Sequence, residues 1–225
     1  MFSILSLMRH GEYMQAVLSI LSRCFVVFCC MPIHELAHGW VAYKLGDNTA
    51  NLQGRLTFNP LKHMNPIGTL MIFLFGIGYA NPVPINANNF KKPKQGVALT
   101  ALAGPLSNLL MSFISMFFCC ALQSVISSPT GVGYAIAQFF YFAASVNVTL
   151  AVFNLLPIPP LDGSKILAVA LPYKAYYKYM QYERYIMIAL MALLLFGVLD
   201  APILFLSDRM MQLVSFIPKL IFHLR

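Results

Sequence analysis

Four long apolar runs, separated by more polar connectors, limit what this chain can fold into. The runs cover residues 24–43, 97–122, 133–156 and 185–206. Each reaches the length of about 20 residues that a helix needs to cross the hydrocarbon core of a bilayer. Only 10% of the 225 residues are charged, and the mean hydropathy is +0.72. In a soluble domain about a quarter of the residues are charged. We therefore expect a single all-α polytopic membrane domain over residues 1–225.

Three other segments are shorter or interrupted. Residues 66–80 form an apolar run between two Asn-Pro pairs; this run is short for a span and favours a re-entrant hairpin, whose backbone must be covered by protein. An extended stretch should follow, since each proline disfavours helix in the residue before it; it comprises Asn81, Pro82, Val83 and Pro84. We expect residues 1–22 to form an interfacial helix or a lead-in, and residues 207–225 to lie on the surface.

The positions of lysine and arginine predict the orientation. Connectors 44–96 and 157–184 carry six and four of these residues, whereas residues 123–132 carry none. The positive-inside rule therefore places the first two connectors in the cytoplasm and the third outside, in a multi-pass protein of the cell (inner) membrane. The net charge of +8 is spread over loops rather than gathered on one face. It indicates topogenic charge and contact with anionic lipid, and it gives no sign of nucleic-acid binding.

The first apolar run contains the motif His34-Glu35-Leu36-Ala37-His38. Residues four apart lie on one face of a helix, so the two imidazoles can share a zinc ion, while the glutamate can take a proton from a water molecule at the metal. The nearest charged edge of the run is ten residues from His34, or about 15 Å of helix. Ionisable groups at membrane depth indicate a functional site. The motif therefore predicts hydrolytic chemistry inside the membrane.

A hydrolytic zinc site needs a third protein ligand besides the two histidines. Asp162 is the strongest candidate, because prolines at the end of the third run place this carboxylate at the same predicted depth; the alternative is an Asp-Gly turn that caps a helix. Asn154 is expected either to donate a hydrogen bond to the oxyanion of the reaction or to bridge to a carbonyl that the prolines leave unpaired. His63 is expected to be structural, or to lie around the metal site, rather than to be a fourth ligand.

Three motifs in this order resemble the site-2 protease family of intramembrane zinc metalloproteases: residues 34–39 (HELAHG), 103–105 (AGP) and 154–163 (NLLPIPPLDG). Residues 54–60 and 81–84 resemble more narrowly its small bacterial branch, which lacks a PDZ domain. The resemblance extends over about residues 30–172.

This resemblance implies a three-helix catalytic core (24–172) and a re-entrant hairpin; the fourth apolar run adds an accessory C-terminal transmembrane helix and tail (184–225). It implies one Zn2+ per chain. The implied site consists of metal ligands His34, His38 and Asp162, a general base Glu35, and an assisting Asn154 near the scissile carbonyl. The extended part of the hairpin would bind the substrate through Asn81, Pro82, Val83 and Pro84.

The function expected on these grounds is cleavage of a transmembrane protein substrate within the lipid bilayer, near the cytoplasmic side, as in regulated intramembrane proteolysis. The alternative is a non-catalytic membrane protein, either a zinc carrier or a pseudoprotease that holds partner helices. Glu35 argues against that alternative, because binding alone does not require a base. The sequence leaves the identity of the substrate, the cleaved bond and the oligomeric state open.

Overall fold

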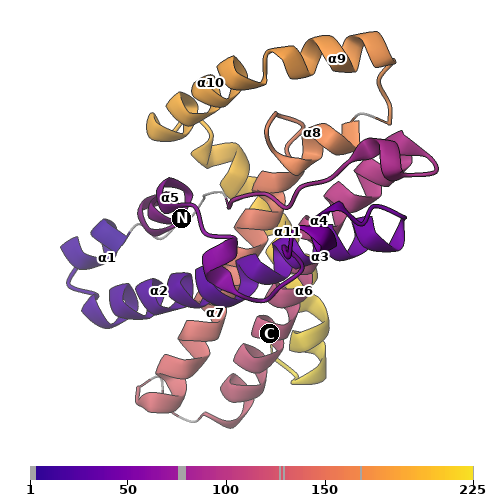
Figure 1. Ribbon diagram of the computed structural model, residues 1–225. Coiled ribbons are helices and arrows are strands. Elements are labelled where there is room, and N and C mark those ends of the chain that lie inside the picture. The colour runs from indigo at the N-terminus through magenta and orange to yellow at the C-terminus, as the bar shows by residue number, and fades with distance from the viewer. Residues whose placement is uncertain (1–3, 76–79, 127, 129, 168, 225) are drawn as a thin grey trace.

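The computed structural model describes the chain except for residues 1–3, 76–79, 127, 129, 168 and 225. The described residues form helices and irregular segments, without a strand (Figure 1). Three of the helices are long and apolar enough to cross a membrane, or four if one bent pair counts as a span. The expected all-α polytopic membrane fold is therefore confirmed.

The helix that carries the histidine motif is longer than expected. Helix α2 (Tyr13–Phe25), a π-helical turn η1 (Val26–Cys30) and helix α3 (Met31–Lys44) form one continuous helix of 32 residues, which is long and apolar enough to cross a membrane. Only α1 (Ile4–Arg9) is separate. The lead-in expected over residues 1–22 is thus helical from residue 13 onward and continues into the helix that was expected to begin at Cys24. The reason is Arg23, which is buried and donates hydrogen bonds to the carbonyl oxygens of Ile72 and Phe73. Because these carbonyl groups stabilise the buried charge of Arg23, the helix continues through this residue.

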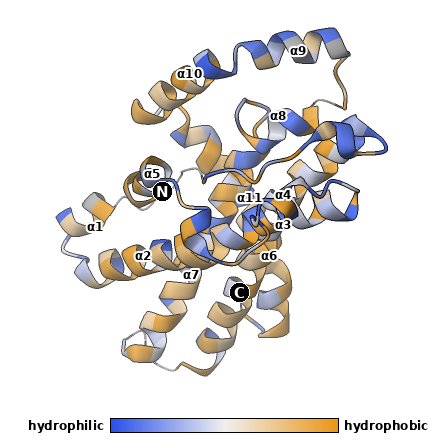
Figure 2. Cartoon of the chain, viewed as in Figure 1, coloured by the Kyte–Doolittle hydropathy of each residue, from blue (hydrophilic) through white to orange (hydrophobic). Residues whose placement is uncertain are grey.

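The second and third spans agree closely with the apolar runs. They are helices α6 (Pro93–Val125) and α7 (Val132–Leu155), joined by a short connector. Their contact is lined by small side chains, among them Cys119, Cys120, Ala137 and Ala144, which are buried in one cluster. Figure 2 shows that both helices are dominated by hydrophobic residues, whereas the hydrophilic ones gather around α4 (Thr49–Leu52), α8 (Asp162–Leu167) and α9 (Tyr173–Gln181).

The C-terminal part differs from the expected single span over residues 185–206. Helices α10 (Glu183–Leu195) and α11 (Asp200–Ile221) meet at an angle of 85°. The break coincides with Gly197, whose φ of +70° is in the left-handed region that favours glycine. Helix α11 packs Met211 and Val214 against the α6–α7 cluster. Most of the segment 207–225 is therefore a packed helix rather than a surface tail.

The predicted hairpin is helical in its first limb and irregular in its second. Its first limb is α5 (Pro66–Phe75), residues 76–79 lie outside the described residues, and residues 80–86 have no regular structure. Arg55 Nη2 donates to the carbonyl oxygens of Asn81 (2.7 Å) and Pro82 (3.1 Å), and Asn81 Nδ2 donates to Met64 O at 2.7 Å. These bonds hold the returning segment in place.

His63 belongs to the connector that supports this segment. It is buried, its ring Nε2 lies 2.9 Å from the carbonyl oxygen of Thr57, and its own carbonyl accepts the Asn81 N–H at 2.7 Å. His63 directly follows η2 (Pro60–Lys62) and joins Thr57 of the connector to Asn81 of the hairpin. These contacts fit the structural role expected from the sequence.

Candidate metal centre

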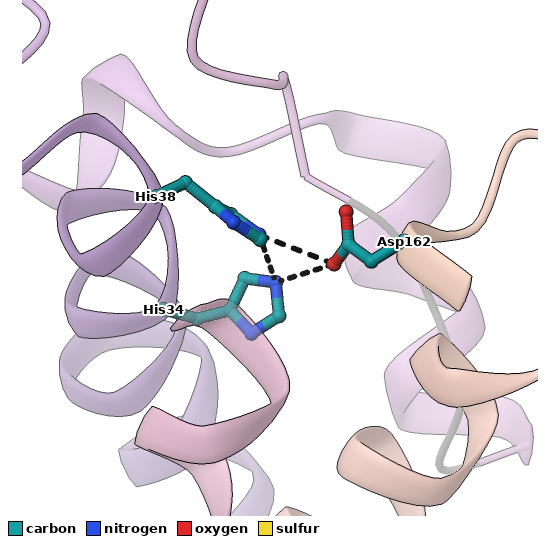
Figure 3. A group of neighbouring side chains, drawn as sticks. All are labelled: His34, His38 and Asp162. Carbon is teal, nitrogen blue, oxygen red and sulfur yellow. Dashed lines mark hydrogen bonds and ion pairs between the residues drawn. The ribbon is translucent and has the colours of Figure 1, made fainter. Parts of the chain in front are cut away.

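His34 and His38 project from one face of α3 toward Asp162 at the start of α8 (Figure 3). This follows from local helix geometry, since residues four apart lie one above the other. Each of the three side chains is buried, with an exposed fraction of 6%. The structure thus brings together, from two segments more than 120 residues apart in the sequence, the three groups that the sequence proposed as metal ligands.

The distances among the three groups fit a tetrahedral zinc site. The two Nε2 atoms lie 3.0 Å apart, and they lie 3.4 Å (His34) and 3.1 Å (His38) from Asp162 Oδ2. Zinc bonds to nitrogen and carboxylate oxygen are about 2.0–2.1 Å long, so the ligand atoms of a tetrahedral site lie about 3.3 Å from one another. Two imidazoles and a carboxylate are also a usual ligand set of hydrolytic zinc. The residues therefore fit this metal.

Helix α6 packs against both histidines and orients His38. The carbonyl oxygen of Thr100 lies 2.7 Å from His38 Nδ1. A carbonyl can only accept, so Nδ1 carries the proton and the lone pair of Nε2 faces the centre. One turn further, a Cβ added at Gly104 would lie 2.3 Å from His38 Nε2 and 2.6 Å from His34 Cε1. Only a glycine lets α6 come this close.

We expect Gly104→Ala to weaken zinc binding, because the new methyl group must displace an imidazole or the helix. Overpacking of this kind costs about 1–3 kcal/mol of stability. Zinc titration and thermal unfolding of the purified variant measure the two effects. Gly133→Ala is the matched control: a Cβ at this helical glycine meets Ile126 at 3.4 Å, an ordinary contact. Wild-type zinc affinity in Gly104→Ala would contradict the close approach.

Asp162 is positioned by the proline-rich segment after α7. This segment ends the helix at Leu155, and α8 then begins so close to it that a Cβ on Gly163 would lie 2.3 Å from the carbonyl oxygens of Leu155 and Leu156. Lys165 Nζ holds the outer oxygen of Asp162, Oδ1, at 3.2 Å. The inner oxygen therefore points at the histidines, and the contacts of this carboxylate are with side chains rather than with a helix N-terminus.

Glu35 makes a contact that the sequence did not predict. Its Oε2 accepts the backbone N–H of Val83 at 3.0 Å, so the returning limb of the hairpin lies directly over the site. Asn81 and Pro82 line the same cavity as Val83, whereas Pro84 is not among the lining residues. The segment expected to bind substrate is thus next to the metal centre.

Asp47 fixes the far end of this segment. Its buried carboxylate accepts the N–H of Asn86 (2.7 Å), the side-chain amide of Asn89 (2.7 Å) and the N–H of Thr49 (3.1 Å). Burial acts to raise the pKa of Asp47, but the hydrogen bond from the Thr49 hydroxyl, together with those from Asn86, Asn89 and the Thr49 N–H, outweighs burial and lowers the pKa below its usual value. Asp47 therefore stays charged and links the end of α3 to η3 (Ala87–Asn89).

The metal centre opens into a cavity of about 300 Å³. Helix α10 forms one wall of it through Met187, Leu190, Met191 and Leu194, although the sequence indicated only an accessory span there. Asn154 also lines the cavity, and its Nδ2 donates to the carbonyl oxygen of Leu150 at 3.0 Å. Reasoning from sequence missed Asn108 of α6, a buried amide in the lining. Its spacing of four from Gly104 was the available signal.

Comparison with known proteins gives consistent matches. Residues 124–197 match the family model described as Peptidase family M50. Three relatives are each named as a candidate zinc metalloprotease. YwhC of Bacillus subtilis is 44% identical over 68% of this chain and 70% of its own length. MJ0611 of Methanocaldococcus jannaschii is 33% identical over 66% of this chain and 74% of its own length. Rip2 of Mycolicibacterium smegmatis is 29% identical over 69% of this chain and 58% of its own length. No solved structure matches the chain significantly.

Proposed function

Because this chain belongs to peptidase family M50, the site-2 protease family, we propose that it is an intramembrane zinc metalloprotease. It hydrolyses a peptide bond within or near a transmembrane segment of a membrane-protein substrate. The observation that carries this proposal is the convergence of His34, His38 and Asp162 beside Glu35, in a buried cavity among apolar helices.

One Zn2+ per chain would be held by His34 Nε2, His38 Nε2 and Asp162 Oδ2. When bound, the ion polarises the scissile carbonyl and lowers the pKa of a water molecule in the site. The protein excludes bulk water around these three groups, each of which is 6% exposed. Electrostatic interactions are stronger in such surroundings than in water.

Glu35 acts as the general base. The hydrogen bond from Val83 N–H to Oε2 fixes the orientation of the carboxylate and leaves Oε1 to take a proton from water. Glu35 then passes this proton to the leaving amine, which would otherwise depart as a strongly basic anion. The same contact couples the base to the hairpin segment that we propose binds the substrate.

Asn154 assists near the scissile carbonyl. A side-chain amide has two N–H donors, and the bond to Leu150 O uses one of them. The second can donate to the oxyanion that develops during attack. The two roles expected for Asn154 from the sequence are therefore compatible, since the bond to its own helix holds the amide in place.

The substrate must be unwound before cleavage, because a helix hides its carbonyl groups. The segment of Asn81, Pro82, Val83 and Pro84 supports the bound chain in an extended form, as an exposed edge does in strand addition. Its two prolines have no N–H, the carbonyl oxygens of Asn81 and Pro82 accept from Arg55, and the Val83 N–H donates to Glu35. The groups that it offers a substrate are therefore the carbonyl oxygens of Val83 and Pro84 and the N–H of Ile85. The basic connectors favour a site that opens toward the cytoplasmic side of the membrane.

A cleavage assay with defined zinc content tests this function. The purified protein, reconstituted in vesicles, is mixed with a panel of single-span model substrates with helix-destabilising residues at different depths. We expect about one zinc per chain, as a single three-ligand site requires, and cleavage that stops on chelation and returns with zinc. Cleavage that persists without zinc would contradict the mechanism. Tight zinc binding without cleavage of any substrate would favour the non-catalytic alternative.

A further inference from the structure

Two buried polar atoms in the cavity lack a hydrogen-bond partner. Several buried side-chain nitrogen and oxygen atoms are unpartnered in the described part of the chain, but only two belong to residues that line the cavity: His34 Nδ1 and Asn108 Oδ1. The two side chains are 6% and 2% exposed. Burying such atoms without a partner costs free energy, so an isolated pair at one site requires an explanation.

The two atoms are chemically complementary once the site is a metal centre. A histidine that binds metal through Nε2 carries its proton on Nδ1, and this N–H is almost always donated to a carbonyl or carboxylate oxygen. His38 has such an acceptor, the carbonyl oxygen of Thr100 at 2.7 Å. His34 has an unpartnered Nδ1 instead, and the side-chain carbonyl of Asn108 is an unpartnered acceptor.

The packing of α6 against the first span places the two residues at the same level. Thr100 contacts His38, and Gly104 abuts both imidazoles. Seven residues further along α6, Met111 packs against the cluster that contains Cys30, one turn before His34.

Helix α6 and the helix that carries His34 and His38 therefore run in opposite directions at this contact. Asn108 lies one turn beyond Gly104 on the same face of α6. Its level falls between the contacts of Gly104 and Met111, which is the level of His34. Gly104 faces Cε1 of the His34 ring, the carbon bonded to both ring nitrogens. Since Nε2 faces Asp162 and His38, Nδ1 is the ring nitrogen left for a side chain of α6.

We propose that Asn108 is a positioning residue for the metal centre. The structure shows no direct hydrogen bond between the two atoms, so Asn108 Oδ1 accepts the Nδ1–H of His34 through one buried water molecule and holds this imidazole in the tautomer and orientation that bind zinc. The inference rests on the proposed zinc site and adds to it an interaction with His34 that parallels the one between Thr100 and His38.

Asn108→Leu removes the acceptor and keeps the branched shape of the side chain. We expect zinc affinity, measured by competition with a chelator, to fall about 10–100-fold, the usual effect of losing such a partner. Asn108→Asp keeps an acceptor oxygen in the same place, and its zinc affinity should equal or exceed that of the wild type. The d–d absorption of the cobalt-loaded protein should change in Asn108→Leu, because the orientation of one ligand changes.

Asn147→Leu is the matched control. Asn147 is also a buried asparagine with an unpartnered Oδ1, but it does not line the cavity. Its replacement should alter thermal stability and leave zinc affinity unchanged. Equal losses of zinc affinity in Asn108→Leu and Asn147→Leu would indicate a general packing effect and overturn the proposal.

The other outcomes are also decisive. Wild-type affinity in Asn108→Leu overturns this inference while leaving the proposed function intact, whereas a wild-type protein that binds no zinc overturns both. If Asn108→Leu does not fold, Asn108→Asp decides alone. A zinc affinity at or above that of the wild type supports the acceptor role, and a reduced affinity refutes it.

Discussion

Replacing Glu35 with Gln is expected to abolish peptide-bond hydrolysis while zinc stays bound. The amide cannot take a proton from water at neutral pH, and positioned general bases contribute about 10²–10⁴-fold to rates. Gln keeps an oxygen that can accept the Val83 N–H, now 3.0 Å from Glu35 Oε2. The local structure should therefore persist. Single-turnover cleavage and zinc content, measured on the same preparation, separate the loss of chemistry from loss of metal.

Glu12→Gln serves as the control for this experiment. Glu12 is exposed and precedes α2, so the same loss of a carboxylate should leave cleavage unchanged. Wild-type cleavage by Glu35→Gln would remove Glu35 from the role of base. Loss of zinc together with activity would instead indicate that Glu35 contributes to binding the metal.

Replacing Asp162 with Ala is expected to remove zinc from the protein. The substitution deletes one of three ligand groups and leaves the two Nε2 atoms, now 3.4 Å and 3.1 Å from Asp162 Oδ2, without their anionic partner. The loss of affinity should exceed the roughly 10–100-fold that follows the removal of a hydrogen-bond partner of a ligand. Metal analysis after dialysis against a weak chelator measures it.

Asp200→Ala is matched to this variant, because Asp162 and Asp200 are each the first residue of a helix, α8 and α11. Both substitutions remove a negative charge from a helix N-terminus, where it is favourable. Only Asp162→Ala should lose zinc. Unchanged metal stoichiometry in Asp162→Ala would refute the ligand role.

The helices that were predicted correctly are those whose boundaries depend only on the local sequence. Helices α6 and α7 coincide with charge-free apolar runs, because a segment that crosses lipid must satisfy its backbone internally. The first span was misjudged at Arg23, whose charge is compensated by carbonyl groups of Ile72 and Phe73, nearly 50 residues away. The last span was misjudged at Gly197, since hydropathy alone does not reveal an 85° break inside an apolar run.

The features of the candidate site likewise fall into two groups: those that follow from local sequence and those that depend on tertiary structure. That His34 and His38 share a face follows from the helical period, so the motif alone determined it. The apolar runs determined a membrane-embedded, all-helical fold. Only the tertiary structure brought Asp162 within 3.4 Å of both imidazoles, placed the Val83 N–H on Glu35 and made α10 a wall of the cavity. These contacts join segments far apart in the chain. They depend on how closely whole helices pack, as at Gly104, and this closeness is a property of the assembled bundle rather than of any one segment.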